Sequence, residues 1–148
     1  MSEIEITTDR TRMSLDTIHR YLSEESYWAN GVPREIVERA MANSLCFAAL
    51  DRDATIGFAR VVTDYATFGY LADVFVLRSH RSRGISKQLM NAVVAHPSLQ
   101  GFRRFHLSTR DAHGLYAQFG FTPVAHPDRH MERLRHNVYR SGLLRDLA

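Results

Sequence analysis

A short basic stretch, HRSRGISKQLM at residues 80–90, holds residue types that bind phosphate. It contains two arginines, a glycine and Lys87, the chain's only lysine, and it lies between an apolar run and a run with helical spacing. The first backbone N–H groups of a helix lack intrahelical acceptors and carry partial positive charge, so an anion is stabilised there. Gly84 has no Cβ and lets a ligand approach the backbone closely. The stretch therefore predicts a phosphate-binding turn, with a solvated basic turn as the alternative.

Two other stretches carry groups suited to proton transfer or to binding a cation. Asp73 lies in the apolar run LADVFV, where an ionised carboxylate is costly unless it is paired, hydrated or functional. We predict a functional carboxylate there, with a structural hydrogen bond as the alternative. Strand alternation predicts that Asp73 shares a face with Leu71 and Phe75. The run SEESYWANG at 23–31 concentrates acidic and aromatic side chains that can attract and enclose a cation, although its only tryptophan also suits helix packing.

The elements that position these groups alternate between helices and strands. The spacing of apolar residues, together with glycine, proline and turn signals, predicts each of them. In chain order they are a strand at 3–6, two helices within 14–43 divided at 30–33, three antiparallel strands at 45–51, 54–65 and 68–76, a helix at 82–95, a strand at 103–109, a helix at 111–119 and a last strand pair at 121–134. This order is typical of an α/β sandwich with a mixed sheet.

Length and composition limit the class of protein. A chain of 148 residues that is 45% hydrophobic and 24% charged predicts a single domain over residues 1–148. The net charge is +3 and the arginines are scattered, so no nucleic-acid partner is expected. Cys46 is the only cysteine, which excludes an intrachain disulfide. The N-terminus lacks a signal-peptide layout and no apolar run has the length of a membrane span, which predicts a cytoplasmic protein without a membrane partner.

The basic stretch resembles the acyl-CoA pyrophosphate loop of the GNAT-type N-acetyltransferase superfamily. In that pattern a strand ends in valine, and an arginine or glutamine follows after a fixed interval. Here Val76 precedes Arg81 by five residues, and RSRGIS at 81–86 continues the pattern. Ser86 replaces the second glycine of the pattern, and Arg78 stands where proline is frequent.

A second stretch, TRDAHGLYAQFGF at 109–121, resembles the family's later motif. Thr109 stands where asparagine is usual. The positions that fit are Ala112, Leu115, Tyr116, Gly120 and Phe121. The resemblance covers a family core at about 45–121, and the region at about 132–148 is predicted as an amphipathic C-terminal extension.

The resemblance implies a GNAT-like fold, with a central, mostly antiparallel mixed sheet, a splayed parallel strand pair and about four flanking helices. It also implies an enzyme that transfers the acetyl group of acetyl-CoA directly to a primary amine in a ternary complex. The acceptor would be a small molecule, a peptide or a protein. A non-catalytic module that binds acyl-CoA or has a regulatory role is the alternative.

Site residues follow from the same resemblance. Tyr116 matches the tyrosine that commonly protonates the leaving thiolate, with aromatic packing on the helix as the alternative. The backbone near Val74, Phe75 and Val76 would hold the pantetheine and the acetyl carbonyl. The predicted coenzyme loop consists of Arg81, Ser82, Arg83, Gly84, Ile85, Ser86 and Lys87. The predicted acceptor-binding residues are Tyr27, Trp28 and Glu24, and Asp73 would act as the base or bind the amine.

No metal cofactor is expected, because the histidines at 126, 130 and 136 lack a supporting ligand motif. We predict surface or packing roles for them. The partner is expected to be an amine that the sequence does not identify, and the assembly a monomer or a homodimer.

Overall fold

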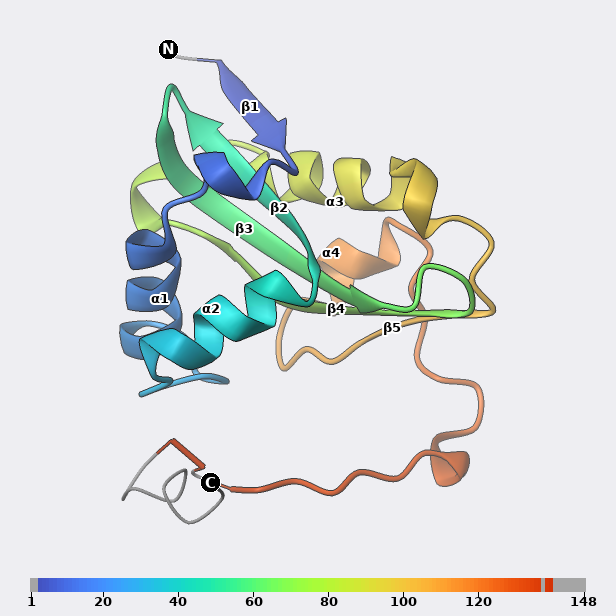
Figure 1. Cartoon of the computed structure of the whole chain (residues 1–148). Coiled ribbons are helices and arrows are strands. Elements are labelled where there is room, and N and C mark those ends of the chain that lie inside the picture. Colours follow the sequence, from blue (N-terminus) through green and yellow to red (C-terminus); the bar gives the residue numbers. More distant parts are fainter. Residues whose placement is uncertain (1–2, 137, 140–148) are drawn as a thin grey trace.

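A computed structural model of the chain describes residues 3–136, 138 and 139. Its strands form one sheet in the order β1-β2-β3-β4-β5, so that every strand lies beside its neighbour in sequence (Figure 1). The strands are β1 (Ile4–Thr7), β2 (Leu45–Asp51), β3 (Ala54–Thr63), β4 (Phe68–Val76) and β5 (Arg104–Leu107). Pairing is antiparallel from β1 to β4 and parallel between β4 and β5. The mixed, mostly antiparallel sheet is therefore confirmed.

Helices cover both faces of the sheet. In the described residues the α-helices are α1 (Leu15–Glu24), α2 (Arg34–Ala42), α3 (Ile85–Ala95) and α4 (His113–Ala117). The 3-10 helices are η1 (Arg10–Arg12), η2 (Arg78–His80), η3 (Pro97–Leu99) and η4 (Pro127–Arg129). The α1–α2 pair lies on one face, and α3 and α4 lie on the other (Figure 1). The four flanking helices expected from the sequence are thus confirmed.

Strand β2 separates two apolar cores. Cys46, Ala48 and Leu50 pack against α1 and α2, whereas Phe47 and Ala49 pack toward α3, and each of these side chains is almost completely buried. Full burial of a large apolar side chain stabilises a fold by about 1.5–3 kcal/mol. The two cores therefore fix the helices at set positions on either face of the sheet.

Helix α3 buries a stripe of apolar side chains that recur every four residues. Ile85, Leu89 and Val93 are 2%, 0% and 0% exposed. The helix begins at Ile85 rather than at the predicted residue 82, because Ser82 and Gly84 have left-handed backbone conformations with φ of 63° and 74°. The buried stripe fixes the direction in which the helix N-terminus points.

A bulge in β4 changes the predicted face of Asp73. The register of β3 and β4 shifts beside it, and Asp73 itself has φ of 56°. Leu71 packs in the core under α3, whereas Phe75 packs in the core under α1. The prediction that Asp73 shares a face with both is therefore wrong, because the extra residue interrupts the alternation between them. Val74 and Val76 lie on the α3 face, opposite Phe75.

The predicted last strand pair at 121–134 is absent. Within these described residues only η4 is regular. Pro123 and Pro127 lack a backbone N–H for ladder pairing, and the contacts to β5 are made by side chains instead. The Arg104 Nη1 lies 3.0 Å from His130 Nε2, and the His130 ring stacks on His106. Of the predicted extension at 132–148, residues 137 and 140–148 lie outside the described residues.

The part of the chain that the structure describes has no helix of the length and apolar character needed to cross a membrane.

Candidate functional site

Two cavities meet beside β4. The first, here called the helix-pair cavity, has a volume of about 570 Å³ and lies between the α1–α2 pair and the sheet. The second, the loop cavity, has a volume of about 700 Å³ and lies between the end of β4 and the start of α3. The residues that line both are Tyr27, Trp28, Val74, Arg110, Asp111, Ala112 and Tyr116. A ligand in one cavity can therefore contact a ligand in the other.

The cavities meet where the parallel strands diverge. The described pairing between β4 and β5 ends at Leu71 and Leu107, but β4 continues to Val76. The backbone of β4 beyond Leu71 therefore borders the cavities on the side where β5 would otherwise lie. This divergence matches the splayed strand pair that the sequence resemblance implies.

The loop before α3 is shaped by its backbone. Gly84, the N-cap residue of α3, is left-handed, and no side chain caps the helix. A Cβ built on Gly84 would meet no atom within 4 Å, so the space around it is open. A helix N-terminus with uncapped N–H groups and open space before it fits an anionic group such as a phosphate.

Side chains hold this loop against the sheet and α1. The Arg81 Nε donates to the carbonyl of Val76 at 3.0 Å, and its Nη2 donates to the Tyr21 hydroxyl at 3.0 Å. His80 Nε2 lies 2.7 Å from Asp51 Oδ2 on β2. Arg81 thus fixes the loop rather than extending freely into the cavity.

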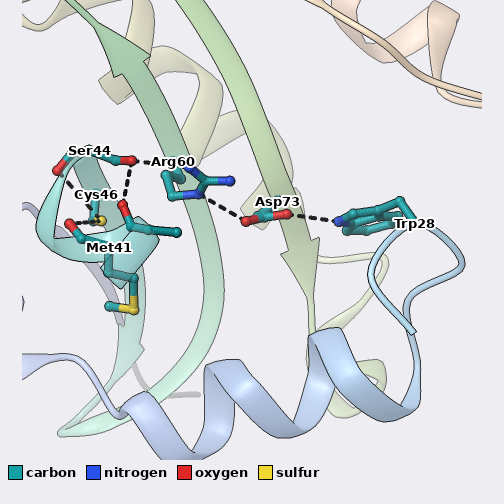
Figure 2. A network of polar contacts seen from close by, with 7 residues as sticks. Trp28, Met41, Ser44, Cys46, Arg60 and Asp73 are labelled. Carbon is teal, nitrogen blue, oxygen red and sulfur yellow. Dashed lines mark hydrogen bonds and ion pairs between the residues drawn. The ribbon is translucent and has the colours of Figure 1, made fainter. Parts of the chain in front are cut away.

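Asp73 lies at the centre of a polar network on the helix-pair side of the sheet (Figure 2). The Trp28 Nε1 donates to Asp73 Oδ1 at 2.8 Å, and the Arg60 Nε donates to Asp73 Oδ2 at 2.9 Å. The Arg60 Nη1 also donates to the Ser44 hydroxyl, which donates to the Ala40 carbonyl in α2. Each carboxylate oxygen of Asp73 therefore already accepts a hydrogen bond, and the side chains of Arg60 and Asp73 are only 17% and 14% exposed.

A second cluster borders the junction between the cavities. The Arg110 guanidinium lies 3.8 Å from the centre of the Tyr27 ring, and the Arg110 backbone N–H donates to the Tyr27 hydroxyl at 3.0 Å. Tyr27 also packs edge-on against Trp28. These contacts fix the segment after α1 to the segment after β5.

Tyr116 lies at the same junction and borders both cavities. It is 8% exposed, and burial raises the pKa of its hydroxyl to about 12, with smaller contributions from Tyr27 and Asp111. Tyr116 therefore stays protonated at neutral pH and can donate a hydrogen bond or a proton to a ligand at the junction.

The structure brings together most of the residues predicted from the sequence. The loop cavity contains Val74, Phe75, Val76, Arg81, Ser82, Gly84, Ile85, Ser86 and Lys87. Asp73 lines the helix-pair cavity. Arg83 and Glu24 are exposed and line neither cavity.

Sequence reasoning missed several residues of the site. The missed residues are Tyr21, Arg60, Tyr70, Arg110 and Tyr139. A signal existed for Arg60, because an arginine in the apolar run ATIGFARVVT and an aspartate in the next strand are each costly alone and compatible as a pair. No comparable local signal marks Tyr139. Among the described residues no group of three or more His, Cys, Asp or Glu side chains is placed to hold a metal ion.

Comparisons with known proteins agree with this geometry. A crystal structure from Xanthomonas campestris pv. campestris, assigned as a GNAT-family acetyltransferase, is 50% identical, with a TM-score of 0.93, and the match covers 95% of this chain and 99% of that one. A protein of Gibberella zeae assigned as an acetyltransferase is 27% identical over 135 residues, which cover 76% of this chain and 75% of that protein.

A more distant solved structure shares the fold. It is the aminoglycoside N-acetyltransferase AAC(6')-Iy in complex with the bisubstrate analogue CoA-S-monomethyl-acetylneamine. Its TM-score is 0.63 at 22% identity, over 91% of this chain and 99% of that one. The model of the acetyltransferase (GNAT) family matches residues 15–121, and the chain therefore belongs to this family.

Proposed function

We propose that this protein transfers the acetyl group of acetyl-CoA directly to a primary amine while both substrates are bound. The observation that carries the proposal is the junction of the two cavities at Tyr116, next to the divergence of β4 and β5. Acetyl-CoA would occupy the loop cavity and the amine the helix-pair cavity. Holding the two reacting groups together lowers the entropic cost of their reaction.

The loop cavity has the features needed to hold the coenzyme. The α3 N-terminus and the open space at Gly84 suit a pyrophosphate, and Lys87 adds a positive charge at the same end of the helix. Arg81 keeps the loop in shape through its bonds to Val76 and Tyr21. Backbone groups of β4 near Val74 would orient the acetyl carbonyl.

Proton transfer completes the reaction. A bond forms between the amine nitrogen and the acetyl carbon, the bond between that carbon and the sulfur breaks, the amine loses a proton and the CoA sulfur gains one. Tyr116 would donate a hydrogen bond to the departing sulfur and pass it a proton, and Tyr116 would then recover a proton from water. A thiol has an ordinary pKa of about 8.5, so the sulfur leaves readily and the contribution of Tyr116 is modest.

The contacts of Asp73 support a positioning role rather than that of a base. Its two oxygens hold Trp28 and Arg60, so proton abstraction would compete with both bonds. We propose that water in the helix-pair cavity accepts the amine proton, and that Asp73 fixes the indole and the guanidinium that border the amine.

The structure of AAC(6')-Iy supports the arrangement of substrates. That enzyme shares the fold and was solved with an analogue in which CoA and an acetylated amine are joined in one molecule. Two adjoining cavities in the present chain suit two such adjoining ligands.

The first test is the shift in melting temperature on adding acetyl-CoA, CoA or ATP. A ligand that binds only the folded state stabilises it by about 2.7 kcal/mol at a hundredfold excess over its Kd. We expect a shift with both CoA species and little with ATP, and thiol release when amines are added to the acetyl-CoA complex. A shift without thiol release from any amine would favour a non-catalytic acyl-CoA-binding module. No shift at all would overturn the coenzyme assignment.

A further inference from the structure

The charges that line the helix-pair cavity balance one another. Among the described lining residues the formally charged ones are Arg60, Asp73, Arg110 and Asp111. Arg60 pairs with Asp73 at 2.9 Å, while Arg110 stacks on Tyr27 and lies 3.8 Å from Asp111. The described wall therefore carries no excess of negative charge. A polycationic amine would bring several charges into the cavity and find no surplus carboxylate to pair with them.

Apart from these charged groups, the wall consists mainly of aromatic and aliphatic side chains. The aromatic residues are Tyr27, Trp28, Tyr70, Tyr116 and Tyr139, and most of the other uncharged lining residues are aliphatic. Because the Trp28 N–H is taken by Asp73, the indole offers a ligand only its apolar ring. A volume of about 570 Å³ suits a small molecule with a ring-sized body.

Tyr139 reaches this wall from the C-terminal segment. Residues after α4 pass η4 and return toward the α1–α2 side, drawn from orange to red in Figure 1. Tyr139 packs against the apolar core under α1 and α2, and a Cβ on Gly31 would lie 3.6 Å from its carbonyl. Burial and Asp73 raise the pKa of the Tyr139 hydroxyl, while Arg60 lowers it, so this hydroxyl lies within the field of the Asp73–Arg60 pair. The match to the family model ends at residue 121, so Tyr139 lines the cavity from outside the matched region.

We infer that the helix-pair cavity takes a small monoamine with an apolar, ring-sized body, and that Tyr139 is the residue that closes the cavity around that body. The inference rests on the proposed function, because it names the acceptor class for the same site. It predicts discrimination against polyamines and aminoglycosides by charge, and it assigns the ring contact to a residue beyond the matched family region.

Binding can be measured without acetyl transfer, because Trp28 is the only tryptophan of the chain and borders the cavity. Its fluorescence would be titrated with 2-phenylethylamine, with 4-(aminomethyl)phenethylamine, which adds a second ammonium to the same ring, and with spermidine. We expect a Kd for 2-phenylethylamine at least tenfold lower than for either of the other amines. A tighter complex with spermidine or with the diamine, or no fluorescence change with any amine, would overturn the inference.

Variants of Tyr139 test the wall itself. Tyr139→Ala should raise the Kd for 2-phenylethylamine about tenfold, whereas Tyr139→Phe, which keeps the ring, should stay within about twofold of the parent. Tyr65→Ala is the matched control, because Tyr65 is 53% exposed on the turn between β3 and β4 and lines neither cavity. Melting temperatures of all variants show that each remains folded. Unchanged affinity in folded Tyr139→Ala would remove Tyr139 from the site.

The two proposals fail in different ways. If the monoamine binds as expected but no amine releases CoA from acetyl-CoA, the proposed transfer is wrong and the amine site stands. If thiol is released fastest with neamine, spermidine or a tripeptide with a free N-terminus, the transfer stands and the acceptor class is wrong.

Discussion

The loop cavity and the helix-pair cavity adjoin, yet they are built in different ways. The loop cavity takes its shape from the backbone, through the left-handed Ser82 and Gly84, the α3 N-terminus and the divergence of β4 from β5. The helix-pair cavity takes its shape from interlocked side chains of distant segments. Trp28 and Asp73 lie 45 residues apart in sequence, and Tyr27 and Arg110 lie 83 apart.

This difference separates what a family shares from what distinguishes its members. A backbone-built site binds the part of a ligand that is common to all reactions, here proposed to be the coenzyme. A side-chain-built site can be altered by single substitutions without changing the fold, so it suits selection among acceptors. Substitutions in the two cavities should therefore affect different measurements.

The largest expected effect comes from the loop cavity. Gly84→Glu should weaken acetyl-CoA binding by at least a hundredfold, because the new side chain fills the open space and its charge repels phosphate. Isothermal titration with acetyl-CoA measures the loss.

Gly101→Glu provides the matched control. Gly101 is also left-handed with open space around its Cβ position, but it borders neither cavity. Both variants impose a similar backbone strain of about 1 kcal/mol, so a difference in acetyl-CoA affinity between them isolates the ligand contact. Equal affinities in the two variants would contradict the phosphate assignment.

An intermediate effect should arise in the helix-pair cavity. Asp73→Asn leaves the mostly buried Arg60 without its counter-charge and should lower the free energy of unfolding by about 2–3 kcal/mol. Asparagine tolerates the left-handed backbone at this position, so the change isolates the charge. Urea denaturation measures the loss, and acetyl-CoA affinity of the folded variant should persist.

Two further variants calibrate this result. Asp16→Asn breaks an exposed ion pair, in which the Arg34 side chain is 51% and the Asp16 side chain 79% exposed. This change should lower the free energy of unfolding by less than about 1 kcal/mol. The double variant Arg60→Met with Asp73→Asn should recover most of the stability, because no unpaired charge remains. If Asp73→Asn instead keeps full stability and loses turnover by a hundredfold or more, Asp73 is a base.

The smallest effect is expected at the junction of the cavities. Tyr116→Phe should lower kcat about tenfold with little change in the KM for acetyl-CoA, because the thiolate is already a good leaving group. Tyr65→Phe serves as the control outside the site. A full-rate Tyr116→Phe variant would leave Tyr116 with a packing role only.

Because the pKa of Tyr116 is raised, the difference in stability between the parent protein and Tyr116→Phe should depend on pH. Because the folded pKa is raised from 10.0 to about 12, the folded state retains this proton where the unfolded state loses it. The resulting stability is fully present below about pH 10 and is lost between about pH 10 and 12, by on the order of 2 kcal/mol. Tyr116→Phe should lack this part of the alkaline loss, while the raised pKa of buried Cys46 acts equally in both proteins. Parallel stability curves for the two proteins above pH 10 would contradict the assignment.

The loop cavity could be predicted from the sequence because its determinants are local. The valine, the arginine and the glycine of the loop lie within one short stretch, and the buried stripe of α3 follows from its own spacing. The order of strands and helices up to α4 was predictable for the same reason.

The helix-pair cavity was only partly predictable, because its partners meet through the fold. The bulge at Asp73 interrupts the alternation of β4 side chains between the two faces of the sheet, which the sequence pattern assumes. It directs the Asp73 carboxylate toward Arg60 and Trp28. Tyr139 reaches the wall only because the segment after α4 leaves the sheet instead of forming the predicted strand pair.

The order of strands in the sheet has a consequence for how the molecule assembles. β2, β3 and β4 join through short connections and pair with their chain neighbours, so this hairpin unit closes few long loops and should form early in folding. The β4-α3-β5 crossover and the docking of the α1–α2 pair close longer loops and come later. Both cavities exist only after these late steps. Ligands of the two cavities should therefore slow unfolding while leaving the rate of hairpin formation unchanged.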